Sequence, residues 1–207
     1  MLYLGIKTLF NISSSITTFG NAPIYSTHRG GKMANVPITM QELRLKSFSI
    51  FDDQWFLLTC GDMENHHFNS MTISWGSIGI MWNKPFVQVV VRPTRYTFEF
   101  MQKYPDFSVC AFPEIYRKAL SLLGSESGRD GDKIARSGLT PHAGSKINSP
   151  VFKEPNLIFE CRKIYSDVFR PQQFLDPEIE GMYTKNDYHA VYYGEILAIS
   201  GDRTLYT

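Results

Sequence analysis

The stretch MWNKPFVQVVVRPTRYTFEF, residues 81–100, joins two patterns that decide the fold. Residues 85–92 are dense in β-branched side chains, which favour a strand. Residues 94–104 then place apolar side chains at helical spacing before a proline, with Thr94 or Thr97 as the N-cap. The stretch therefore predicts a strand that leads directly into a short helix.

Further strand-like segments lie on both sides of this stretch, at 53–60, 69–82, 106–112, 156–168 and 189–200. Only short helices separate them, at 94–104, at 114–124 and near 130–137. Many strands with few short helices predict a mainly β protein. We expect a closed or partly closed antiparallel barrel with Greek-key-like connections rather than a doubly wound parallel sheet.

Two local features refine this prediction. Gly76 and Gly79 interrupt the long segment 69–82 and indicate a bulge or a close backbone approach. In the helix at 114–124, Ile115, Ala119 and Leu122 share one face, and Gly124 takes the position that follows the helix.

Length and composition indicate one globular domain and argue against nucleic-acid-binding and membrane-spanning proteins. A chain of 207 residues is long enough for one domain with a sizeable core. Residues 1–40 are rich in small polar residues without lasting periodicity, which predicts a flexible N-terminal extension ahead of a domain at 41–207. The net charge of +1 argues against a strongly basic nucleic-acid surface. No stretch approaches the ~20 apolar residues of a spanning helix, so we expect no membrane partner.

The three cysteines are widely spaced and form neither a CxxC motif nor a Cys/His pair at zinc spacing. We therefore expect buried, reduced thiols, no metal site and a cytoplasmic protein.

The strand segment NSMTISW, residues 69–75, carries the first candidate chemistry. As a strand it places Ser70, Thr72 and Ser74 on one face. A row of hydroxyl groups can bind a polar heteroaromatic ring or a phosphate. The solvent-facing side of an ordinary amphipathic strand would give the same pattern.

Three other segments are candidates for anion or substrate binding. Residues 92–97 put two arginines and two threonines at a helix start, which suits a phosphate but also a capped helix with surface arginines. Residues 125–133 combine two glycines with Lys133, which suits an anion but also a polar surface loop. His189 can orient or protonate a substrate, or be a partly buried structural histidine.

These pieces follow one another in a specific order: NSMTISW at 69–75, the stretch at 81–100, SGRDGDK at 127–133 and HAVYYGEI at 189–196. In this order they resemble the flavin reductase-like family, in its flavoredoxin-type branch, across about 47–200. The resemblance implies an FMN-binding split β-barrel that works as a homodimer, with the flavin at the subunit interface.

The resemblance also implies roles by position. Met71, Thr72, Ser74 and Trp75 would line the flavin ring and ribityl chain. The phosphate would lie among Arg92, Arg95, Tyr96 and Thr97, and Ser127, Gly128 and Lys133 would close over the cofactor. His189 would be the catalytic residue, placed near the nicotinamide of the electron donor.

The function that follows is an FMN-binding oxidoreductase that takes hydride from NAD(P)H and passes electrons through bound FMN. Because the cofactor carries the difficult chemistry, the absence of a catalytic triad is consistent with this function. Two alternatives remain at this point. One is a flavoredoxin-like electron-transfer protein served by a redox protein partner, and the other is a non-enzymatic module that binds a different planar ligand.

Overall fold

The computed structural model describes residues 35–207, and residues 1–34 lie outside the described part. The strands are β1 (Val36–Pro37), β2 (Phe56–Asp62), β3 (His67–Ile73), β4 (Gly76–Met81), β5 (Lys84–Val91), β6 (Asp106–Ala111), β7 (Pro141–His142), β8 (Val151–Phe152), β9 (Leu157–Val168) and β10 (Ala190–Gly201). The helices are α1 (Ser49–Asp52), α2 (Tyr96–Lys103), η1 (Glu114–Tyr116), α3 (Arg117–Ser125), α4 (Lys133–Ser137), η2 (Pro171–Gln173), α5 (Pro177–Glu180) and α6 (Arg203–Tyr206).

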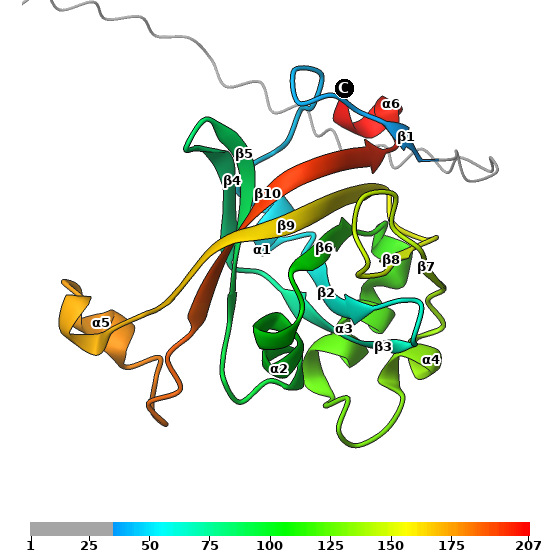
Figure 1. Ribbon diagram of the computed structural model, residues 1–207. Helices are drawn as coiled ribbons and strands as arrows, with labels where there is room; N and C mark the ends of the chain where they lie inside the picture. Colours follow the sequence, from blue (N-terminus) through cyan, green and yellow to red (C-terminus); the bar gives the residue numbers. More distant parts are fainter. Residues whose placement is uncertain (1–34) are drawn as a thin grey trace, which may run out of the picture. The chain divides into compact units, whose positions relative to one another are not determined.

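One antiparallel sheet organises these residues (Figure 1). Its strand order is β3-β2-β6-β9-β10-β5-β4, and β1 pairs with the end of β10. The register of β10 against β9 shifts twice, between Tyr193 and Gly194 and between Ile196 and Ala198. Such irregularities bend a strand pair and increase its twist. The prediction of a mainly β, antiparallel architecture with short helices is confirmed.

The main core lies on one face of this sheet. Alternating residues of β5, namely Val87, Val89 and Val91, enter it, while Phe86 and Val90 point to the other face. Residues of β2, β3, β6, β9 and β10 join the same cluster. Because six strands contribute to one apolar interior, the sheet curves around its core as the barrel prediction requires.

A second apolar cluster lies behind β2, β6 and β9, where α3 and α4 cover the sheet (Figure 1). Here the expected helix face is wrong in part: Ala119 and Leu122 are half-buried and pack against this cluster, but Ile115 does not. α3 buries Leu120 and Leu123, whereas Ile115 lies in η1 and is 80% exposed. Gly124 lies inside α3 rather than after it. The segment begins as a 3₁₀ turn, and this changes which residues of the following α-helix meet the core.

The long segment predicted at 69–82 forms two strands, β3 and β4, which do not pair with each other. β3 pairs with β2, and β4 pairs with β5. The expected close approach occurs at Gly76, where an added Cβ would lie 2.5 Å from the carbonyl oxygen of Gln88. The residues between the strands, Ser74 and Trp75, are therefore free to face the space described below.

Residues 169–189 connect β9 to β10 and are called the excursion below. It carries η2 and α5 and projects from the far ends of the two strands (Figure 1). At the other end, Val36–Pro37 pair with β10 and Ile38 is buried in the core, so the folded part begins before residue 41. The expectation for residues 1–34 lies outside the described residues. No helix within residues 35–207 is both long and apolar enough to cross a membrane.

Candidate functional site

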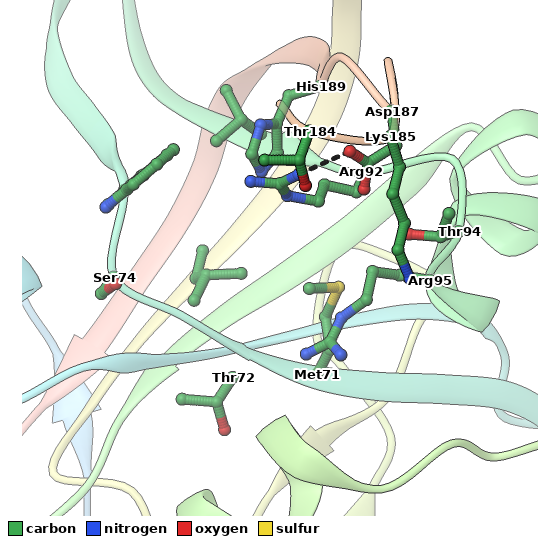
Figure 2. Close-up of a pocket in the computed structure, with 13 residues that line it drawn as sticks. Met71, Thr72, Ser74, Arg92, Thr94, Arg95, Thr184, Lys185, Asp187 and His189 are labelled. Atoms are coloured by element: carbon green, nitrogen blue, oxygen red, sulfur yellow. Dashed lines mark hydrogen bonds and ion pairs between the residues drawn. The ribbon is translucent and has the colours of Figure 1, made fainter. Parts of the chain in front are cut away.

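A cavity of about 500 Å³ opens where β3 ends, β5 ends and the excursion turns back (Figure 2). Its volume lies within the roughly 300–1,000 Å³ typical of small-molecule sites. The lining residues come from three segments far apart in the chain: Met71, Thr72, Ile73, Ser74, Trp75, Val90, Arg92, Thr94, Arg95, Thr184, Lys185, Asp187 and His189. The structure thus brings together seven of the residues that the sequence singled out.

The apolar end of the cavity is formed by Trp75, Val90 and His189. The Trp75 and His189 rings lie 5.3 Å apart between centroids, with an interplanar angle of 47°. Trp75 is 46% exposed, so its ring is available to a ligand. Val90 adds an aliphatic surface from the outer face of β5. Together these side chains suit one end of a planar aromatic ligand.

His189, at the apolar end of the cavity, is buried and neutral. Its Nδ1 atom lies 2.9 Å from the hydroxyl oxygen of Tyr183. Burial of the imidazole, together with the positive charge of Arg92, lowers the pKa of His189 from 6.5 to about 4. Near neutral pH the side chain is therefore uncharged. It suits orienting a ligand by a hydrogen bond rather than protonating one.

Arg92 ties the end of β5 to the excursion. Its Nη1 donates to Oδ1 of Asp187 at 2.7 Å, and its Nη2 donates to the carbonyl oxygen of Met182 at 3.0 Å. Its guanidinium also lies over the Tyr183 ring, 4.9 Å from the centroid. The resemblance implied a phosphate ligand at this position. The contacts show an arginine that lines the cavity and also holds the excursion in place.

A smaller cavity of about 80 Å³ adjoins the polar end and shares Met71, Thr94 and Arg95 with the larger one, and the two are called the joined cavities below. Arg95 donates to the carbonyl oxygen of Gly124 near the end of α3. Lys133 is buried there and donates to the carbonyl oxygens of Leu123 at 2.8 Å and Glu126 at 2.9 Å. Burial and the charge of Arg95 lower the pKa of Lys133 to about 8.

Positive charge predominates at this end. The two cavities are lined by four cationic side chains, Arg92, Arg95, Lys133 and Lys185, and by two carboxylates. Both carboxylates are engaged: Asp187 pairs with Arg92, and Glu126 pairs with Arg136 at 2.6 Å. Within residues 35–207, Arg95, Lys133 and Lys185 form no salt bridge with a carboxylate. An anion would supply the missing opposite charge.

The row of hydroxyl groups predicted on β3 does not form one open face. Ser70 is buried, with its Oγ 2.7 Å from Oγ1 of Thr59. Thr72 Oγ1 donates to the carbonyl oxygen of Leu120 in α3 at 2.5 Å, although Thr72 still lines the cavity. Ser74 is exposed at the end of the row. Tertiary contacts with β2 and α3 thus engage two of the three hydroxyl groups.

Neither predicted threonine caps α2. The N-cap is Arg95, whose side chain makes no capping hydrogen bond. Thr97 is instead buried, and its Oγ1 accepts a 2.7 Å hydrogen bond from the Asn69 side-chain amide. It lines the smaller cavity, with Tyr96 and Ser127 beside it.

Gly128 is required by close packing beside this cavity. A Cβ at this position would lie 2.3 Å from Asn69 Oδ1 and 2.9 Å from the Tyr96 ring. Gly128 therefore packs directly against α2 and β3, whereas residues 129–132 are exposed and Lys133 is buried again.

The family model described as the flavin reductase like domain matches residues 49–206. The chain belongs to the flavin reductase like domain family. The match covers most of the chain, and it includes every residue of both cavities.

Several solved structures share the fold. An FMN-binding domain of a flavin reductase-like enzyme from Shewanella baltica is 15% identical, with a TM-score of 0.59 over 83% of this chain and 80% of that chain. Flavoredoxin from Methanosarcina acetivorans is 25% identical, with a TM-score of 0.55 over 72% and 68%. An NADH:FAD oxidoreductase from Streptomyces globisporus is 15% identical, with a TM-score of 0.55 over 74% and 77%. No curated protein matches the sequence. The prediction of a split-barrel flavin reductase-like fold is confirmed.

Sequence reasoning identified His189 but not the other residues that the excursion contributes to the cavity. Thr184, Lys185 and Asp187 line the larger cavity, yet they belong to no motif. Their position depends on how the excursion folds back between β9 and β10. In the sequence these residues form only a polar loop directly before His189. The composition of such a loop does not predict which part of the fold it will contact.

Proposed function

We propose that the chain binds FMN in the joined cavities and acts as an oxidoreductase that accepts hydride from NAD(P)H. One observation carries this proposal: a single site has an aromatic end at Trp75 and His189 and, at its other end, cations without carboxylate partners. FMN has two ends that match those of the site, because its planar ring is joined by a polar chain to a phosphate. Membership of the flavin reductase like domain family supports the same ligand.

The residues present fit FMN at both ends. Trp75 and Val90 would contact the ring system, with the Ser74 hydroxyl group near it, and Met71 would lie along the polar chain. Arg95, with Lys133 behind it, would face the phosphate, and Thr94, Tyr96, Thr97 and Ser127 line the same space. Gly128 packs against Tyr96 beside it. Bound FMN would supply the redox chemistry, because the flavin ring accepts a hydride and passes its electrons on.

The role of the protein is then to position the reactants and exclude water. His189 is neutral, is held by Tyr183, and faces the cavity beside Trp75. It can orient the carboxamide of a nicotinamide by a hydrogen bond without adding charge next to the hydride-accepting ring. The family relative from Streptomyces, named as an NADH:FAD oxidoreductase, supports a nicotinamide donor.

A second function is favoured by a different observation. The relative from Methanosarcina acetivorans, 25% identical, is named a flavoredoxin. In addition, the sequence carries no GxGxxG segment for a dinucleotide. In this alternative the bound FMN is reduced and oxidised by a redox protein partner, and His189 is structural.

We also propose that the protein is a homodimer that pairs through the outer face of β4, β5, β9 and β10. An aromatic cluster, formed by Trp82, Phe86, Tyr165 and Tyr193, covers this face with ring centroids 5.3 to 5.9 Å apart. Trp82 is 56% exposed and Tyr165 45% exposed. Exposed aromatic patches of this kind mark interaction sites. Phe86 and Val90 share this side of β5, so the face continues into the cavity.

The three buried free thiols fit a cytoplasmic protein.

The decisive experiment is the visible spectrum of the purified full-length protein with FMN, recorded before and after anaerobic addition of NADH and then NADPH. Flavin bands that bleach with a nucleotide would support the NAD(P)H-dependent activity and identify its donor. Flavin bands that persist with both nucleotides would favour the electron carrier. Failure to take up FMN would refute both functions and leave a binding module for another ligand.

A further inference from the structure

We infer that Lys185, on the excursion, is a phosphate ligand of the flavin cofactor and makes the site select FMN over riboflavin. The inference rests on the proposed function and extends it to a residue outside the family motifs. Lys185 lines the larger cavity together with Thr94 and Arg95. Its side chain extends from the excursion toward these two residues, at the polar end of the site (Figure 2).

The backbone that carries Lys185 has a defined shape. The Asn186 N–H donates to the carbonyl oxygen of Tyr183 at 2.9 Å, which closes a tight turn over residues 183–186. Asn186 has a φ of 53°, a left-handed conformation that asparagine tolerates better than most residues. Thr184 and Lys185 occupy the two central positions of this turn, and both line the cavity.

The turn is attached to buried groups on both sides. Tyr183 is buried, its ring stacks on Phe174 with centroids 5.8 Å apart, and its hydroxyl group meets His189. After the turn, Asp187 accepts the hydrogen bond from Arg92. Arg92 therefore acts as a positioning residue, because it joins the excursion to β5 on the same side of the cavity as Arg95. The lysine is thus presented by an anchored turn.

The charge of Lys185 has no counterpart in the described part of the chain. Within residues 35–207 it forms no salt bridge, and both carboxylates that line the cavities pair with arginines. A lysine ammonium group on a flexible stem binds phosphate as a point charge, while an arginine supplies directed hydrogen bonds. Lys185 and Arg95 would therefore contact one phosphate from the excursion and from the start of α2.

Riboflavin, which has the same ring and ribityl chain without the phosphate, provides the test. Dissociation constants for FMN and riboflavin are measured with wild-type protein, Lys185→Ala, Lys185→Arg and Lys153→Ala. Lys153 is an exposed lysine that follows β8 and lines neither joined cavity, so its variant controls for a lost surface charge. We expect Lys185→Ala to weaken FMN binding about tenfold, as for one charged hydrogen bond, and to leave riboflavin binding unchanged. Lys185→Arg should retain most of the FMN affinity, and Lys153→Ala should match wild type.

Other results would overturn the inference in distinguishable ways. Equal FMN affinity in Lys185→Ala and Lys153→Ala would show that Lys185 does not contact the phosphate, while the proposed flavin site would stand. Equal losses for FMN and riboflavin would show that Lys185 shapes the excursion instead. A wild-type protein that binds neither flavin would refute the proposed function together with the inference. The expected tenfold effect should shrink as salt is raised, because Lys185 is exposed.

Discussion

The Nδ1 atom of His189 lies 2.9 Å from the hydroxyl oxygen of Tyr183, and this contact ties the last residue of the excursion, directly before β10, to its interior. If Tyr183 donates this hydrogen bond, the Nε2–H of His189 is the free donor of the ring. The imidazole also lies beside the Trp75 ring. Tyr183 thereby fixes the orientation of His189, and as the donor it would also leave the Nε2–H for a ligand.

The first prediction concerns the reduction of bound FMN. We expect His189→Ala to retain FMN and to be reduced by NAD(P)H about fivefold more slowly, because one orienting hydrogen bond contributes roughly 1 kcal/mol. Stopped-flow absorbance under anaerobic conditions measures the rate. Tyr183→Phe is the matched variant, since it keeps the ring and removes the hydroxyl group. It should show a smaller effect in the same direction. Equal reduction rates in His189→Ala and wild type would make His189 structural.

The second prediction concerns stability at mildly acidic pH. The pKa of His189 is about 4 in the folded protein and 6.5 as its ordinary value, so between these values the unfolded chain binds more protons. Folded stability is therefore lost as pH falls from about 6.5 toward 4. Urea unfolding at pH 7.5 and pH 5 should show that His189→Gln loses about 1–2 kcal/mol less than wild type over this interval. The same loss in both proteins would contradict a neutral, buried His189.

The third prediction separates Arg95 from Thr97, which the resemblance placed together around the phosphate. Arg95→Ala should weaken FMN binding by about 1.5–3 kcal/mol, the value of a charged hydrogen bond, and leave riboflavin binding unchanged. Titration of each flavin with the protein measures both constants. Arg203→Ala, which removes an arginine from a surface salt bridge in α6, is the control for charge. Unchanged FMN affinity in Arg95→Ala would place the phosphate elsewhere.

Thr97 should behave differently, because its hydroxyl oxygen accepts a hydrogen bond from Asn69 in the interior. Thr97→Val would leave the Asn69 amide without this partner and lower the free energy of unfolding by about 1–3 kcal/mol. Thr94→Val, at an exposed position, should change the stability by less than about 0.5 kcal/mol. If Thr97→Val weakened FMN binding without loss of stability, Thr97 would be a direct phosphate contact instead.

The fourth prediction concerns alkaline pH. Burial and the charge of Arg95 hold the pKa of Lys133 at about 8, so this cation loses its proton as pH rises above that value. The cavity then attracts a phosphate less strongly. The ratio of riboflavin to FMN dissociation constants should therefore fall between pH 7 and pH 9.5, because titration of the ring is common to both ligands. Lys133→Met should give a lower ratio that does not change over this range. If the wild-type ratio of dissociation constants stayed constant over this pH range, the charge of Lys133 would not contribute to phosphate binding.

The sequence by itself determined the class of fold and the family. β-branched runs such as 85–92 and alternation within 156–168 are local properties of strands, and β5 and β9 appear where these patterns predict them. The antiparallel direction of neighbouring strands follows from the short connections between them, because parallel strands need a long crossover. The residues of β3, the start of α2 and segment 127–133 were identified from their own composition, and the structure brings them to adjoining cavities.

Only the tertiary structure decided what these side chains do. Arg92 holds the excursion, Thr97 accepts a hydrogen bond from Asn69, and Thr72 donates to α3, because each partner lies at least 25 residues away in the chain. Local patterns carry no information about such partners. Lys185 is the clearest case. Its sequence surroundings are an ordinary polar loop, and its place in the site depends on a turn anchored by the buried Tyr183 and by the contact between Arg92 and Asp187.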